Sequence, residues 1–269
     1  MKKELRALLA SSFAVMAFVV TSCGNNENNE PAALAGEGNV TLDITSKANS
    51  FTTTRAVDEA TYANIAGYTV KILTAEGVEK TSSLYSEIPT TIKLDNGSYI
   101  LQATYGEAYK DAIASRDGFY VTGERNFQVQ GKDVTVSVDC YPTCGKLKAS
   151  FSDNMSEYFS NYYIEFQTEK SKANNNGKIM WAAEDKDPWY VTLTSDSKGE
   201  DVTAVVTYTR LSDSKKLTQA FSYNMTSGKQ WNLNIVPKDN GGYMVIDIVI
   251  DETTNDRPVD IEVPGDWLD

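Results

Sequence analysis

The sequence predicts an all-β protein in which two antiparallel β-sandwiches follow one another along the chain. Apolar and polar residues alternate with a period of two, for example over residues 134–138 and 202–208, as they do in half-buried strands. Turn signals separate these runs at short intervals, and Asp95-Asn96-Gly97 has the signature of a hairpin. Helical turns are expected only at residues 107–116 and 154–159. Many short strands with regular turns are typical of sandwiches.

The chain begins with a leader. Lys2, Lys3 and Arg6 make the start basic, and the apolar stretch from Ala7 to Val20 is too short to span a bilayer as a stable helix. This order of segments is typical of a signal peptide and predicts export.

Small residues lead from the leader to Cys23, an order that resembles the lipobox of bacterial lipoproteins. The resemblance implies that residues 1–22 are the signal peptide and that the thiol of Cys23 carries the lipid, palmitate for example. Two or three acyl chains on Cys23 would then hold the protein durably on the outer membrane. The alternative is an ordinary secretory signal in which Cys23 is incidental.

Three segments follow the leader. Residues 23–38 are polar, contain Gly and Pro and lack an apolar period, so we expect a flexible tether. We expect the first sandwich over residues 39–142 and the second over residues 143–269. The boundary is placed at Pro142 because proline cannot continue a central strand, and both parts have common domain sizes.

Composition excludes several classes of function. The net charge is −12 although the leader is basic. This argues against binding to nucleic acid, which needs a basic face, and against electrostatic docking on anionic lipid. Histidine is absent, which excludes Ser-His-Asp and Cys-His catalysis and any His-ligated metal site. We therefore expect no enzyme, no cofactor and no metal.

Two acidic clusters, residues 184–187 and Asp251-Glu252, were the remaining candidates for carboxylate chemistry. A glycosidase needs two carboxylates on opposite sides of a sugar, which the spacing does not indicate. Calcium could bind at Asp185 and Asp187, but the ordered spacing of an EF-hand loop is absent. Charges in turns are the better interpretation.

Aromatic residues offer a different candidate site. Trp181, Trp189 and Tyr190, with Tyr162-Tyr163, could form a face on which sugars stack. Aromatic residues in strands more often pack in the core or across strands. Glycan binding therefore stays open as an alternative without direct support.

Cys140 and Cys144 flank Pro142. In an oxidising exterior they could form a disulfide across this turn, although so short a loop would add little chain entropy. Alternatively, both are buried thiols. The pair alone is no metal site, because the other ligands are missing.

The order of these elements resembles the fimbrillin-like lipoproteins of the Bacteroidales, including an uncharacterised branch near the type V pilins. The resemblance rests on the lipobox, on a second β domain and on five segments along the first one. The five segments are Val40–Thr45, Thr54-Arg55-Ala56, Gly67–Ile72, Ile92–Tyr99 and Val134–Cys140.

The resemblance implies two transthyretin-like β-sandwiches in tandem. In the pilins an arginine-specific protease cuts after the first strand, and a strand of the next subunit fills the groove that opens. The matching position here is Arg55, which precedes Ala56; Arg55 could equally be a solvated loop residue. The chain departs from the structural pilins in having no obvious long C-terminal donor extension, although residues 258–267 alternate in the same way and could serve as a donor.

The sequence thus favours a non-catalytic lipoprotein of the cell surface or fimbrium. We expect a pilus-type subunit or adhesion component that joins other fimbrial subunits by donor-strand exchange. The alternative is a lipid-tethered module that binds a glycan or a host ligand.

Overall fold

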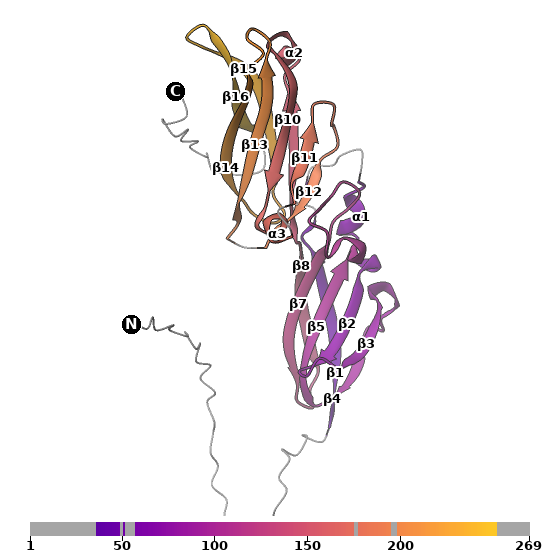
Figure 1. Ribbon diagram of the computed structural model, residues 1–269. Coiled ribbons are helices and arrows are strands. Elements are labelled where there is room, and N and C mark those ends of the chain that lie inside the picture. The colour runs from indigo at the N-terminus through magenta and orange to yellow at the C-terminus, as the bar shows by residue number, and fades with distance from the viewer. Residues whose placement is uncertain (1–35, 49–50, 52–56, 175–176, 195–197, 252–269) are drawn as a thin grey trace, which may run out of the picture. The chain divides into compact units, whose positions relative to one another are not determined.

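The computed structural model describes residues 36–48, 51, 57–174, 177–194 and 198–251. The prediction of an all-β protein is confirmed, because strands form nearly all of the regular structure in these residues (Figure 1). Helical segments are short. They are α1 (Ala60–Ala63), α2 (Met155–Tyr158), α3 (Glu169–Ala173) and the 3-10 turns η2 (Ile65–Gly67), η3 (Tyr85–Glu87) and η4 (Glu107–Tyr109). Two of them, α2 and η4, lie where the sequence predicted helical turns.

A seven-stranded sheet contains most of the strands before residue 143. Its spatial order is β3-β2-β5-β7-β8-β1-β4. The strands are β1 (Glu37–Ser46), β2 (Thr69–Thr74), β3 (Glu79–Leu84), β4 (Ile92–Asp95), β5 (Gly97–Tyr105), β7 (Val121–Val129) and β8 (Val134–Pro142).

This sheet folds over on itself between β7 and β8. The two strands pair only at Val121–Pro142 and Thr122–Tyr141, whereas β5 pairs with β7 along its whole length. The strands β3-β2-β5-β7 therefore make one layer and β8-β1-β4 the other. Their inward residues share one hydrophobic cluster, which we call the first cluster. It includes Val70, Ile72, Leu101 and Val121 from one layer and Val40, Leu42, Ile44, Val136 and Val138 from the other.

Two further sheets contain the remaining strands. Their orders are β11-β10-β13-β14 and β16-β15-β9-β12-β6. The strands are β6 (Ala114–Ser115), β9 (Cys144–Phe151), β10 (Phe159–Gln167), β11 (Ile179–Ala182), β12 (Trp189–Thr192), β13 (Glu200–Arg210), β14 (Lys216–Met225), β15 (Gln230–Asn240) and β16 (Tyr243–Asp251). A second cluster gathers apolar side chains of both sheets, among them Trp181, Leu147, Ile164, Val206 and Leu233.

One predicted turn is wrong in kind and another is confirmed. Asp95-Asn96-Gly97 does not join a hairpin, because β4 pairs with β1 while β5 pairs with β2 and β7. The turn instead carries the chain from one layer to the other, so that Leu94 and Tyr99 enter the first cluster from opposite sides. The predicted turn at residues 239–242 does join a hairpin, with Asn240 paired to Tyr243.

The chain passes from β8 to β9 at residues 142–144, where the sequence placed its boundary. All described residues belong to one compact unit, and β6, from the first half of the chain, pairs with β12 in the second. The division into domains at residues 142 and 143 therefore stays a prediction.

Candidate assembly site

The first strand lies in the interior of its layer. β1 pairs in parallel with β8 over seven residues, from Val40–Val134 to Ser46–Cys140, and antiparallel with β4 from Glu37–Asp95 to Val40–Ile92 (Figure 1). β1 thus meets a neighbour on each edge, β4 along residues 37–40 and β8 along residues 40–46. Without β1, the facing N–H and C=O groups of β8 and β4 would have no strand partner.

The side chains of β1 alternate as the sequence predicted. Val40, Leu42 and Ile44 are 0%, 9% and 3% exposed and pack in the first cluster. Asp43 points the other way and is exposed. Burial of three aliphatic side chains ties the strand to the core, since each stabilises the fold by about 1.5–3 kcal/mol relative to an exposed position.

Polar contacts fix the register of β1. The side-chain amide of Asn39 donates to Asp133 at 2.9 Å, and the hydroxyl of Ser137 donates to Asp43 at 3.1 Å. On the other side, the hydroxyl of Tyr85 donates to the carbonyl oxygen of Leu42 at 3.1 Å. A slip of β1 by one residue would turn its side chains to the opposite face and move its carbonyl groups along the strand. All of these contacts would then break.

Gly38 allows β1 to approach its neighbours closely. A Cβ atom at this position would lie 2.6 Å from the carbonyl oxygen of Lys132 and 2.7 Å from Cγ1 of Val129. Only glycine fits there without a shift of the backbone. No local pattern indicates this role, because an isolated glycine near the start of a strand has several interpretations.

The segment after β1 is buried on either side of the predicted cleavage position. Ala48 and Phe51 belong to the first cluster, and the ring of Phe51 meets that of Phe119 edge-on with centroids 5.3 Å apart. Val57 is buried as well. Arg55 and Ala56 come between these residues in the sequence but lie outside the described residues. The predicted lipid-attachment residue Cys23 and the possible donor segment 258–267 lie outside them as well. Their predicted roles remain predictions.

The two cysteines are free, buried thiols instead of a disulfide. The sulfur of Cys140 points to the carbonyl oxygen of Ala103 at 3.8 Å, inside the first cluster. Burial raises the pKa of Cys140 to about 12. Burial, with the nearby Glu59 carboxylate, also raises the pKa of Cys144. The two thiols thus have different surroundings on either side of the Pro142 turn, and each is held as a neutral group.

A buried ion pair connects the two halves of the chain. The ammonium of Lys146 on β9 lies 2.7 Å from Oε1 of Glu59, which immediately precedes α1, and the hydroxyl of Tyr190 on β12 donates to the same carboxylate. Burial lowers the pKa of Lys146, while the hydrogen bond to Glu59 opposes that shift. No local pattern in the sequence indicates this cluster, because its residues lie far apart along the chain.

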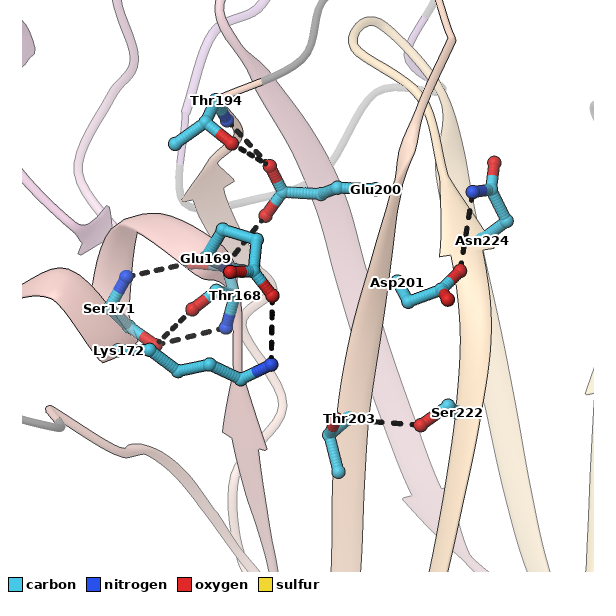
Figure 2. Close-up of polar contacts among 10 residues, drawn as sticks. All are labelled: Thr168, Glu169, Ser171, Lys172, Thr194, Glu200, Asp201, Thr203, Ser222 and Asn224. Carbon is cyan, nitrogen blue, oxygen red and sulfur yellow. Dashed lines mark hydrogen bonds and ion pairs between the residues drawn. The ribbon is translucent and has the colours of Figure 1, made fainter. Parts of the chain in front are cut away.

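Glu200, at the start of β13, is a second buried carboxylate and holds α3 in place (Figure 2). One oxygen accepts from the backbone and the hydroxyl of Thr194, both at 2.6 Å, and the other accepts from the backbone N–H of Glu169 at 2.9 Å. Thr168 and Ser171 cap the same helix reciprocally. Both carboxylate oxygens are therefore satisfied, which indicates a structural role.

The acidic cluster at residues 184–187 is tied to Arg116. The guanidinium of Arg116 donates to the Asp185 carboxylate at 2.6 Å and to the carbonyl oxygen of Asp187 at 2.7 Å. Asp185 also accepts from the backbone N–H of Ala182. Within the described ranges, no group of three His, Cys, Asp or Glu side chains could hold a metal ion.

The aromatic residues considered for sugar stacking do not form one open face. Trp181 and Tyr190 are 0% and 1% exposed. The Arg116 guanidinium lies over the ring of Trp189, 4.3 Å from its centroid. Tyr162 packs on Phe151. The described parts of the chain thus use most of these rings for packing.

Among the residues that the structure describes, no helix combines the length and the apolar character that a membrane crossing requires.

Solved structures similar to this chain come from species of Bacteroides and Parabacteroides. A fimbrial assembly protein of Parabacteroides distasonis is 10% identical, with a TM-score of 0.44, and the similarity covers 85% of this chain and 99% of that one. A candidate adhesin of Bacteroides ovatus is 10% identical, with a TM-score of 0.43, and the coverage is 85% and 95%. A candidate cell adhesion protein of Bacteroides eggerthii is 8% identical, with a TM-score of 0.42 and coverage of 84% and 98%. At such scores the similarity does not extend to a site or an activity.

None of the curated proteins matches the chain. The family model described as the domain of unknown function DUF4493 matches residues 36–265, which is most of the sequence. This agrees with the uncharacterised branch that the sequence indicated. The chain therefore belongs to the DUF4493 family.

Proposed function

We propose that this protein is a non-catalytic surface lipoprotein that works as a fimbrial subunit or adhesion component and assembles by strand addition. In this proposal the lipid on Cys23 anchors it in the outer membrane, and other fimbrial subunits are its partners. One observation carries the proposal: β1, the first strand of the fold, lies between β8 and β4 and fills the core with Val40, Leu42 and Ile44.

Release of β1 would leave an apolar groove, and exposure of this groove to water would cost free energy. A cut after Arg55 would separate the chain up to that residue, which includes Ala48 and Phe51 as well as the three aliphatic residues of β1. Each large apolar side chain lost from the core would expose a pocket worth about 1.5–3 kcal/mol. Unpaired backbone groups on β8 and β4 would add to this cost, and a strand from another subunit would satisfy both needs.

The test is limited digestion of the purified full chain with an arginine-specific protease, followed by size measurement and peptide binding. We expect cleavage after Arg55, followed by growth into oligomers or by binding of a peptide with the sequence of residues 258–267. Arg55→Ala should abolish both results. The matched control is Arg125→Ala, which replaces an exposed arginine on β7 and should change neither.

Two outcomes would overturn the strand-addition mechanism. In one, Arg55 resists the protease in the folded protein. In the other, the protein is cut but neither assembles nor binds the peptide. Either result would favour a tethered ligand-binding module instead.

A further inference from the structure

Lys146 and Glu59 carry the two groups that an amide crosslink needs, an amine and a carboxyl group, and these groups are in contact. The Lys146 side chain is 0% exposed, the Glu59 side chain is 4% exposed, and the nitrogen of one lies 2.7 Å from an oxygen of the other. A buried ion pair gains little stability, because desolvation of the two charges offsets their attraction. We propose that Lys146 and Glu59 form an intramolecular amide bond between Nζ and Cδ.

The surroundings favour the neutral forms that this reaction needs. The rings of Phe51 and Tyr190 lie beside the ammonium, with centroids 5.8 Å and 5.9 Å from Nζ. Phe119 packs on both rings. In such an apolar site the ammonium gives up a proton more readily than in water, which yields a neutral amine. A desolvated, neutral lysine amine is a good nucleophile.

The two oxygens of Glu59 differ in the way that the reaction requires. Oε1 accepts hydrogen bonds from both the Lys146 ammonium, at 2.7 Å, and the Tyr190 hydroxyl, which together polarise the carboxyl group. Oε2 is buried and has no hydrogen-bond partner among the described residues. Oε1, the oxygen that proton donors reach, is therefore placed to leave, and Oε2 is placed to remain as the amide oxygen.

The atoms and protons balance without a further reactant. The first proton moves from the Lys146 ammonium to Oε1, the oxygen that it contacts at 2.7 Å, and the amine nitrogen then attacks Cδ of Glu59. A second proton passes from the nitrogen to the same oxygen, and Oε1 leaves as water while the N–C bond becomes the amide. No change of oxidation state occurs. Contact between the two groups in the folded chain replaces an encounter in solution and supplies most of the rate advantage.

The crosslink would join the segment just after the predicted cleavage position to β9. Glu59 is four residues beyond Arg55 in the sequence. The new N-terminal end of a processed chain would therefore be held covalently to β9, which belongs to the five-stranded sheet. This inference does not depend on the proposed function, since the amide can form whether or not Arg55 is cut.

The test is peptide mass analysis of the folded full chain after storage at neutral pH and digestion with trypsin. We expect one branched species in which Ala56–Lys71 is joined to Asp133–Lys148, with a mass lower by one water than the sum of the two peptides. Trypsin should fail to cut after Lys146, because the amide removes its charge. Separate peptides with normal cleavage after Lys146 would overturn the proposal.

Three variants sharpen the result. Lys146→Arg keeps the charge but cannot form this amide, so the branched species should vanish and trypsin should cut at the new arginine. Lys148→Arg changes an exposed neighbour on the same strand and should leave the crosslink intact. Tyr190→Phe removes the polarising hydroxyl and should slow formation, giving a mixture at early times. A loss of water that persists in Lys146→Arg would contradict the assignment, and the wild-type spectrum decides the question if a variant does not fold.

Discussion

β1 and β9 hold equivalent positions in the two halves of the chain but differ in what holds them. β1 lies between a parallel neighbour, β8, and an antiparallel one, β4; β9 lies in the same way between β15 and β12. The inward residues of β1 alternate with partly or fully exposed ones, whereas the first four residues of β9 are all buried. Besides packing and backbone pairing, β1 is held by a few hydrogen bonds at or near the surface, whereas β9 also carries the buried ion pair between Lys146 and Glu59. We therefore expect β1 to be the easier of the two strands to exchange.

The largest expected effect tests the extra contact of β9. Glu59→Ala leaves the Lys146 nitrogen buried without the carboxylate, so the free energy of unfolding should fall by about 3–5 kcal/mol. Unfolding in urea measures this change. The exposed Glu87 provides the control, since Glu87→Ala should change stability by less than about 0.5 kcal/mol. A small effect at Glu59 would show that β9 and β1 are held alike.

Truncation of one leucine on each strand compares their packing. Leu147→Ala on β9 and Leu42→Ala on β1 should each lower the free energy of unfolding by about 2–5 kcal/mol, because both side chains fill the core. Leu147 should lie at the upper end, since it is 0% exposed and Leu42 is 9% exposed. Denaturant unfolding of both variants measures the difference. A loss below about 1 kcal/mol at Leu42 would mean that β1 is a surface strand.

Two glycines sharpen the comparison on a smaller scale. In Gly38→Ala the new methyl group would meet a backbone carbonyl 2.6 Å away, and in Gly145→Ala it would meet the side chain of Met225. Backbone cannot move aside as a methionine side chain can, so we expect a loss of about 1–3 kcal/mol for Gly38→Ala and a smaller one for Gly145→Ala. Thermal unfolding would rank the two variants, and the reverse order would show that the start of β1 is loosely held.

The smallest effect at neutral pH concerns Cys140, on the strand beside β1. Burial raises its pKa to about 12 in the folded protein from an ordinary value of 9.0. The unfolded chain therefore loses the thiol proton first as the pH rises, and the stability that this thiol contributes is present below pH 9 and lost between about pH 9 and 12. The slope should reach at most about 1.4 kcal/mol per pH unit for one thiol.

Urea unfolding at a series of alkaline pH values tests this slope in the wild type and in Cys140→Ala, which should be less steep. Tyr68, whose pKa burial also raises to about 12, should account for much of the remaining slope. An unchanged slope in Cys140→Ala would place the thiol in contact with water.

How far the sequence predicted the molecule depends on the distance over which each signal acts. The alternation of Val40, Leu42 and Ile44 with polar residues correctly predicted a buried face, because every second side chain of a pleated strand points to the same face. The prediction of a hairpin at residues 95–97 was wrong. A turn signal predicts that the chain changes direction, but it does not identify the strand with which the next segment pairs. The Glu59–Lys146 contact depends on the folded arrangement of three segments, and no local pattern contains that information.

The parallel pairing of β1 with β8 has a mechanical consequence. With the proposed lipid anchor on Cys23, a pull toward the membrane would act on the N-terminal end of β1, while a load on the rest of the chain would act on β8 through its C-terminal end at Pro142. The two strands run in the same direction, with Val40 beside Val134 and Ser46 beside Cys140, so these forces oppose one another along the strand axis. The hydrogen bonds of the ladder would then be strained together in shear and would not open one after another, which would make the strand whose exchange we propose resistant to tension.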